Sequence, residues 1–93
     1  MDQKEIIILA GWVKASSYRN RVMINLGNKT KTPSSIARDA QIRMNHVSAV
    51  LKSLKEKQLI ICLNEDSKKG RLYQITDLGK QVINMAKNIE WIS

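Results

Sequence analysis

The stretch from Thr32 to Lys57, TPSSIARDAQIRMNHVSAVLKSLKEK, constrains the fold most, because it predicts two short helices joined by a tight turn. Thr32 can accept a hydrogen bond from a free backbone N–H, and the fixed φ of Pro33 suits the first helical position. We therefore predict a first helix over residues 33–40. A second helix is predicted over residues 44–57, because its apolar residues recur at i, i+3, i+4 and i+7, the spacing of a helix that buries one stripe: Val47, Val50, Leu51 and Leu54.

The opposite face of the second predicted helix is polar and basic. Its residues are Arg43, Asn45, His46, Ser48, Ala49, Lys52 and Lys55, and no acid occurs before Glu56. This face can donate and accept hydrogen bonds and carries positive charge.

The segment before this helix pair predicts two further elements. Three consecutive isoleucines favour a strand over residues 3–14, but the length of the run and its place before another helix favour a helix, which we prefer. Ser16 or Ser17 can cap a following helix that ends at about Leu26. Its inward residues are predicted to be Tyr18, Val22, Met23 and Leu26.

The segment after the helix pair predicts a hairpin and a last helix. Residues 59–63 (LIICL) and 71–76 (RLYQIT) have the pattern of strands, and residues 64–70 (NEDSKKG) have the composition of a turn. The last helix is predicted to start at Thr76–Asp77, with an apolar stripe formed by Leu78, Val82, Met85, Ala86, Ile89 and Ile92.

Together these patterns resemble the winged helix-turn-helix, and in particular small archaeal MarR/ArsR-like transcriptional regulators. The resemblance covers residues 16–85 and rests on the helix-turn-helix spacing of Ile36, Ala37, Ala40, Ile42, Val47 and Val50, on Lys69-Gly70-Arg71, and on Thr76 to Lys80. One departure is Gln41, where many members have Gly, the residue that adopts a positive φ at little cost.

The resemblance implies an α+β, mostly α fold: a three-helix core, a β-hairpin wing, and N- and C-terminal flanking helices. A single domain over residues 1–93 is expected, with its core at 16–76 and flanking segments at 1–15 and 77–93. A very short strand is also expected near Lys31. The 93-residue length suits one domain with a modest core.

The resemblance implies a sequence-specific regulator that binds double-stranded DNA. The second helix would enter the major groove, where Arg43 could pair with guanine and Asn45 with adenine. The other expected contacts are His46, Ser48, Ala49 and Lys52 on this helix, Lys68, Lys69 and Arg71 on the wing, and Lys31, Thr32 and Ser34 on the DNA backbone. The alternative is a winged-helix module for general nucleic-acid (DNA or RNA) or protein binding.

The charge distribution favours a polyanionic partner. The net charge is +8, and residues 14–57 hold ten basic residues against two acids, while bases and acids are equal in number elsewhere. Cys62 has no second cysteine to pair with, which favours a reducing, cytoplasmic location. The apolar run over residues 6–13 is too short to span a bilayer, so no membrane association is expected.

The ends of the chain carry apolar residues that a small winged helix has little core to cover. We expect a homodimer interface formed by Ile6, Leu9, Trp12, Met85, Ile89, Trp91 and Ile92. The alternative is that these residues pack on each other within one monomer.

For several residues a purely structural or surface role competes with a functional one. His46 could contact a base or simply lie on the surface, and Cys62 is more typical of a small buried residue than of a redox sensor. Lys55, Lys57, Lys80 and Lys87 are interpreted as solvated surface residues. We find no catalytic arrangement, so no enzyme is expected. No metal, cofactor or small-molecule effector site is expected either, because one His and one Cys cannot fill a metal site.

Overall fold

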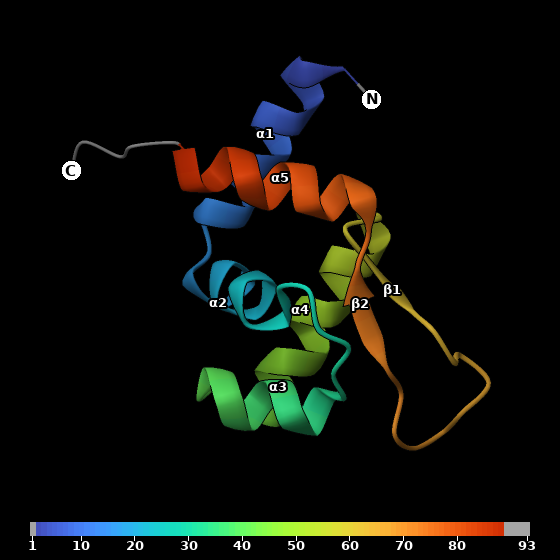
Figure 1. The fold of residues 1–93 in the computed structure, drawn as a ribbon. Coiled ribbons are helices and arrows are strands. Elements are labelled where there is room, and N and C mark those ends of the chain that lie inside the picture. Colours follow the sequence, from blue (N-terminus) through green and yellow to red (C-terminus); the bar gives the residue numbers. More distant parts are fainter. Residues whose placement is uncertain (1, 89–93) are drawn as a thin grey trace.

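The computed structural model describes residues 2–88 and has a winged helix-turn-helix fold (Figure 1). Within this range the elements follow in the order α1 (Gln3–Lys14), α2 (Ser17–Leu26), α3 (Pro33–Ala40), α4 (Met44–Glu56), β1 (Ile60–Cys62), β2 (Tyr73–Ile75) and α5 (Asp77–Asn88). The predicted helix pair, hairpin and flanking helices are confirmed. Residues 3–14 form a helix and not a strand.

Side-chain caps set the starts of four helices, as the sequence chemistry requires. The hydroxyl of Ser16 accepts from Arg19 N at 3.2 Å, and that of Thr32 accepts from Ser35 N at 3.2 Å. Asp2 accepts from Glu5 N at 2.9 Å, and Thr76 from Gly79 N at 3.0 Å. Each cap satisfies a backbone N–H that has no partner within its own helix, typically contributing about 1 kcal/mol.

The turn between α3 and α4 has the left-handed geometry that the helix-turn-helix needs, although its residue is not glycine. Gln41 has φ 57° and ψ 49°. A left-handed conformation costs a residue with a Cβ about 1–2 kcal/mol. The guanidinium of Arg21, on α2, donates to the carbonyl oxygens of Ala40 and Gln41, so these turn carbonyls are satisfied from a third helix.

The hairpin is shorter than predicted. β1 and β2 pair antiparallel, with Ile60 opposite Ile75 and Cys62 opposite Tyr73, whereas the predicted strands covered residues 59–63 and 71–76. One further backbone hydrogen bond lies beyond each end of the ladder, from Leu63 N to Leu72 O and from Thr76 N to Leu59 O. Gln58 has φ 62°, so the chain turns sharply just before the strand begins. On β2, Tyr73 also exchanges both backbone hydrogen bonds with Lys31, at 3.1 and 2.9 Å, which confirms the very short strand expected near Lys31.

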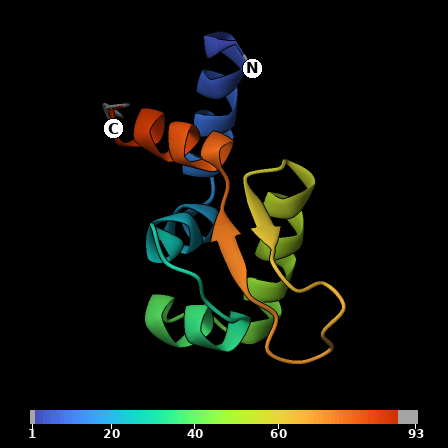
Figure 2. The ribbon, with the colours of Figure 1, turned by 45° about the vertical axis from the view of Figure 1, so that its right-hand side comes forward.

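The core extends from the helix-turn-helix into the two flanking helices. It includes Ile36, Val47 and Leu54 from the helix pair, and also Val13 from α1 and Val82 from α5. α1 and α5 pack against each other at one end of the molecule, and α3 and the wing loop, residues 63–72 between β1 and β2, lie at the other end (Figure 1, Figure 2). The flanking helices are therefore continuous with the central core.

One close approach joins α5 to the hairpin. Gly79 is buried, and a Cβ at this position would collide with the carbonyl oxygen of Leu59 and lie 2.6 Å from Cγ2 of Ile75. Only a residue without a side chain allows the first turn of α5 to lie this near to the chain that leaves α4.

The prediction that Tyr18 points inward is wrong. Val22, Met23 and Leu26 of α2 are fully buried, but Tyr18 is 38% exposed. Its ring lies 5.0 Å from that of His46 on α4, centroid to centroid. Tyr18 is in the first turn of α2, one turn before Val22. Its side chain lies against His46 at the surface and not in the core.

Candidate nucleic-acid interface

The outward face of α4 presents the polar residues that the sequence predicted. Val47, Val50, Leu51 and Leu54 are at most 9% exposed and anchor the helix. Arg43, Asn45, His46, Ser48, Ala49 and Lys52 are all exposed. Arg43 is the N-cap residue, and its side chain makes no capping hydrogen bond. The free N–H groups and the partial positive charge of the helix start lie beside these residues.

The wing loop is braced from inside by Asn64. Its side-chain oxygen accepts from Leu72 N at 2.7 Å, and its side-chain nitrogen donates to Gly70 O at 3.2 Å and to the Ser67 hydroxyl at 3.4 Å. Lys68 and Lys69 lie exposed on this braced loop. The loop therefore presents two ammonium groups from a structured turn.

Arg71, predicted as a DNA contact, also holds the wing loop. Its guanidinium donates to Ser67 O at 2.8 Å and to Glu65 O at 3.3 Å. The residue is exposed, so its remaining N–H groups can still reach a ligand.

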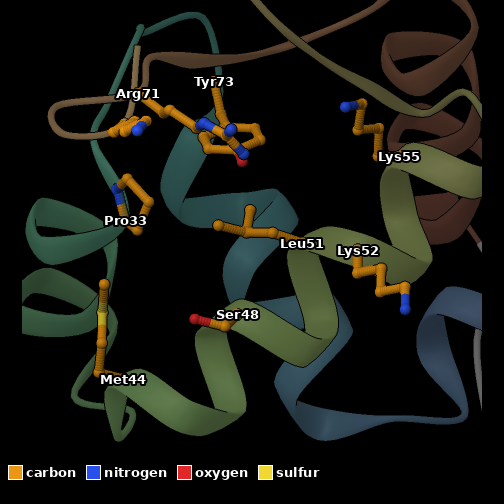
Figure 3. A pocket seen from close by; sticks show the side chains of 9 residues that line it. Pro33, Met44, Ser48, Leu51, Lys52, Lys55, Arg71 and Tyr73 are labelled. Atoms are coloured by element: carbon orange, nitrogen blue, oxygen red, sulfur yellow. The ribbon is translucent and has the colours of Figure 1, made fainter. Parts of the chain in front are cut away.

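A groove of about 400 Å³ separates α4 from the wing (Figure 3). Ser48 and Leu51 of α4 form one wall, and Tyr73 and Arg71 of the hairpin lie across from them. A second groove of about 450 Å³ continues toward the start of α3 and is lined by Thr32, Pro33, Ser34, Met44, Lys68, Lys69, Gly70 and Arg71. The exposed face of α4, the start of α3 and the wing thus border one continuous surface.

An ion pair joins α4 to the wing loop beside the first of these grooves, which Lys55 lines. The ammonium of Lys55 on α4 contacts the carboxylate of Glu65 on the wing loop. The hydrogen bond with Lys55 lowers the pKa of Glu65 below 4.5, and the bond with Glu65 raises the pKa of Lys55 above 10.5. The interpretation of Lys55 as merely solvated is wrong, because its partner is on the wing.

Of the three residues expected on the DNA backbone, two also serve the fold. Lys31 donates to Asn25 Oδ1 at 2.8 Å and to Asp39 Oδ2 at 3.0 Å, and its side chain is only 13% exposed. Thr32 caps α3, whereas Ser34 is exposed. The hydrogen bonds of Lys31 and then Arg38 hold the pKa of Asp39 below 3.8. Part of the basic surplus is therefore neutralised within the chain.

Of the residues expected at a dimer interface, four lie in the described part of the chain, and all four pack on the core of the monomer. Ile6 is 8% exposed and belongs to the core of the chain, and Leu9, Trp12 and Met85 are partly buried against that core. Trp12 is further covered by Arg19, whose guanidinium lies 4.1 Å from the ring centre and donates to Trp12 O at 2.6 and 3.0 Å. Ile89, Trp91 and Ile92 lie outside the described residues.

Two isoleucines of the apolar run near the start of the chain are exposed on α1. Ile7 is 48% exposed and Ile8 is 62% exposed, beside the buried Ile6. Three isoleucines in succession must point to different sides of a helix, so at least one had to face outward. They leave an apolar surface on α1.

Met44, which was not among the predicted contacts, also lies at the surface bordered by α4, the start of α3 and the wing. It is the first residue of α4, is 45% exposed, and lines both grooves. Its position three residues before Val47 continues the spacing of the buried stripe, so no pattern in the sequence distinguishes it from a core residue.

Cys62 and the possible metal ligands and membrane spans complete the description of the side chains. Cys62 is partly buried, with its Sγ 3.7 Å from Asn64 Oδ1. Among residues 2–88, no three His, Cys, Asp or Glu side chains gather as metal ligands. No helix in the same range is long and apolar enough to cross a membrane.

The fold places the chain among the winged-helix proteins. A MarR-family transcription regulator of known structure matches with a TM-score of 0.73 and 14% identity over 91% of this chain and 58% of its own. ZitR of Lactococcus lactis, in a mutant form, matches with a TM-score of 0.63 and 23% identity over 78% of this chain and 49% of its own. The chain thus spans about half the length of these two proteins.

A third match has nearly the same length as this chain. TubR from Bacillus thuringiensis serovar israelensis pBtoxis, solved bound to 24 bp of tubC, matches with a TM-score of 0.74 and 16% identity over 89% of this chain and 92% of its own. No family model matches the sequence, and no curated protein matches it. The likeness to these structures is thus one of fold, and nothing in the comparisons supports the archaeal part of the resemblance.

Proposed function

We propose that the protein is a transcriptional regulator that binds double-stranded DNA in a sequence-specific manner. The observation that carries this proposal is the outward face of α4, which is polar and basic from Arg43 to Lys55 and borders a groove whose far side carries Lys68 and Lys69. The likeness in fold to a MarR-family transcription regulator and to TubR, solved bound to 24 bp of tubC, supports it.

In this proposal α4 enters the major groove and the wing follows the backbone or the minor groove. Arg43 is suited to bidentate pairing with guanine, and Asn45 with adenine. His46, Ser48, Ala49 and Lys52 complete the contacts of α4, and Lys69 is a sequence-independent phosphate contact. Lys31 and Arg71 would act chiefly by holding the surface in shape, since both are bonded within the chain.

We also propose that the protein acts as a homodimer in the cytoplasm. Ile7 and Ile8 leave an apolar surface on α1, at the end of the molecule away from α3. A second copy covering this surface would present two α4 helices to successive major grooves of a palindromic site.

The test is binding to random-sequence duplex DNA and duplex RNA of equal length at several salt concentrations, followed by sequence selection. We expect a log–log salt slope that corresponds to several released counterions on DNA, and an enriched palindromic motif. Weak binding to both duplexes, or binding without an enriched motif, would contradict sequence-specific regulation and would favour a general nucleic-acid or protein-binding module.

Alanine variants separate base readout from backbone contact. Arg43→Ala and Asn45→Ala should each cost about 1–3 kcal/mol on the selected site and relax preference at one base pair. Lys69→Ala should weaken all sequences alike and reduce the salt slope by about one. Identical behaviour of the three variants would contradict this division of roles.

A further inference from the structure

Met44 breaks the polar character of the surface proposed to bind DNA. The other large apolar residues of α4, Val47, Val50, Leu51 and Leu54, are at most 9% exposed, whereas Met44 is 45% exposed. It is the first residue of the helix, next to Arg43 and Asn45. An exposed thioether at this position is not required by the buried stripe.

The surroundings of Met44 define a small apolar spot inside a basic surface. Met44 and Pro33 line both grooves, together with the wing residues Lys68 and Arg71. Figure 3 shows the Met44 side chain extending toward Pro33, with the hydroxyl of Ser48 directed to the same side of α4. The spot therefore lies between a polar helix face and cations that suit phosphates.

Duplex DNA offers one apolar group at the edge of the major groove, the C5-methyl of thymine. Phosphates suit the neighbouring cations Lys68 and Arg71, and an apolar group suits Met44. A thymine in a duplex meets both requirements. A flexible thioether can adapt to the methyl without demanding one geometry.

We infer that Met44 is a specificity-determining residue that reads the methyl group of a thymine. This inference rests on the proposed function and adds a base preference to it: at least one position in each half of the selected site is a T·A pair whose methyl contacts Met44. Ser48, one turn further along α4, would hydrogen-bond the edge of the same or the next base pair.

The experiment replaces each thymine of the selected duplex, one at a time, by deoxyuridine, which lacks only the methyl group. Dissociation constants are measured at one salt concentration for the wild type, Met44→Ala and Met44→Leu. For the wild type we expect a loss of about fourfold at one thymine per half-site, the change given by burial of one methyl-sized group. Met44→Ala should bind the thymine and deoxyuridine duplexes equally, and Met44→Leu should keep most of the difference.

Two controls keep the outcome specific. Ile24→Ala removes a side chain that is 55% exposed on α2 and should retain the full sensitivity to deoxyuridine. Thermal unfolding of each variant tests that the fold is intact, and Met44→Leu keeps the measurement informative if Met44→Ala unfolds.

The other possible results would contradict either the role of Met44 or DNA binding itself. Equal binding of thymine and deoxyuridine duplexes by the wild type, or an unchanged difference in Met44→Ala, would overturn the role of Met44 and leave DNA binding standing. A selected motif without thymine would do the same. Failure to bind any duplex DNA would instead overturn the proposed function itself.

Discussion

The two helix pairs of the molecule, α1 with α5 and α3 with α4, are built alike but leave opposite chemistry exposed. In both pairs one helix packs across the other and contributes to the same core. The outward face of α4 carries amides, hydroxyls and cations, with Met44 as its large apolar residue. The outward face of α1 carries Ile7 and Ile8.

This contrast shows that two helix pairs can share one core and still differ in the kind of partner that their exposed faces can bind. A polar and basic surface is well hydrated on its own and can bind a polyanion. Exposed isoleucines are unfavourably hydrated, and covering them with another apolar surface lowers the free energy. We therefore expect DNA at one end of the molecule and a second copy of the chain at the other.

The largest expected effect comes from breaking the junction between the two halves. Gly79→Ala should lower the free energy of unfolding by about 3 kcal/mol, because the new Cβ would meet the Leu59 carbonyl and Ile75. Chemical denaturation measures the change. Gly11→Ala on α1 is the matched control: its Cβ would meet nothing within 4 Å, so a gain of about 0.5 kcal/mol is expected. Equal effects at the two glycines would contradict the close approach of α5 to the hairpin.

The apolar end of the comparison is tested by adding charge to α1. Ile8→Glu should raise the dissociation constant of the homodimer by about tenfold or more, since a carboxylate buried at the interface would lose its hydration. Sedimentation over a range of concentrations measures the constant. Ile24→Glu, at a similarly exposed position on α2, should leave it unchanged. A wild-type chain that stays monomeric at high micromolar concentration would rule out the dimer.

The left-handed turn of the α3–α4 pair gives a smaller effect in the opposite direction. Gln41→Gly should stabilise the protein by about 1 kcal/mol, because glycine adopts the observed φ of 57° without a Cβ penalty. Thermal unfolding compares it with Gln81→Gly, on the exposed side of α5, which should destabilise by about 1 kcal/mol. Destabilisation by both variants would show that the turn is not strained by Gln41.

The smallest effect concerns the ion pair at the edge of the DNA-binding end. Glu65→Gln should free Lys55 for a phosphate, strengthen DNA binding modestly and steepen the salt slope by about one counterion. Asp66→Asn makes the same change in net charge without removing the partner of Lys55. An identical salt slope for the two variants would mean that Lys55 gains no new contact.

The same pair predicts a pH dependence of stability. Because the pKa of Glu65 is lowered, its contribution is complete above 4.5 and is lost as the pH falls through the lower folded value. Because the pKa of Lys55 is raised, its contribution is complete below 10.5 and is lost as the pH rises through the higher folded value. Glu65→Gln should flatten both limbs in unfolding experiments across the pH range.

The fold was largely predictable because its signals are local. Thr32 and Ser16 mark helix starts, and the spacing of Val47, Leu51 and Leu54 identifies the buried face of α4. The strands were predicted too long because the apolar runs continue through residues just beyond the ladder, such as Leu59 and Leu63, which make one backbone hydrogen bond each across the hairpin but lie outside the strands.

The candidate site was predictable in position but not in detail. Counting bases located the positive half of the chain, yet it could not show that Lys31 pairs with Asp39 or that Arg21 donates to the turn carbonyls. Such pairings join residues from different elements. Met44 escaped notice for another reason, since apolar residues are ordinarily assigned to the core and only its exposure sets it apart.

The reciprocal backbone bonds of Lys31 and Tyr73 have a consequence for the order of folding. These two residues are far apart in sequence, so we expect their pairing to close a long loop only after α3 and α4 have formed and packed. The hairpin would then dock late, as the step that locks the wing onto the helices. Native-state hydrogen exchange should reveal this as a shared opening, in which the amide protons of Lys31 and Tyr73 exchange with the same free energy.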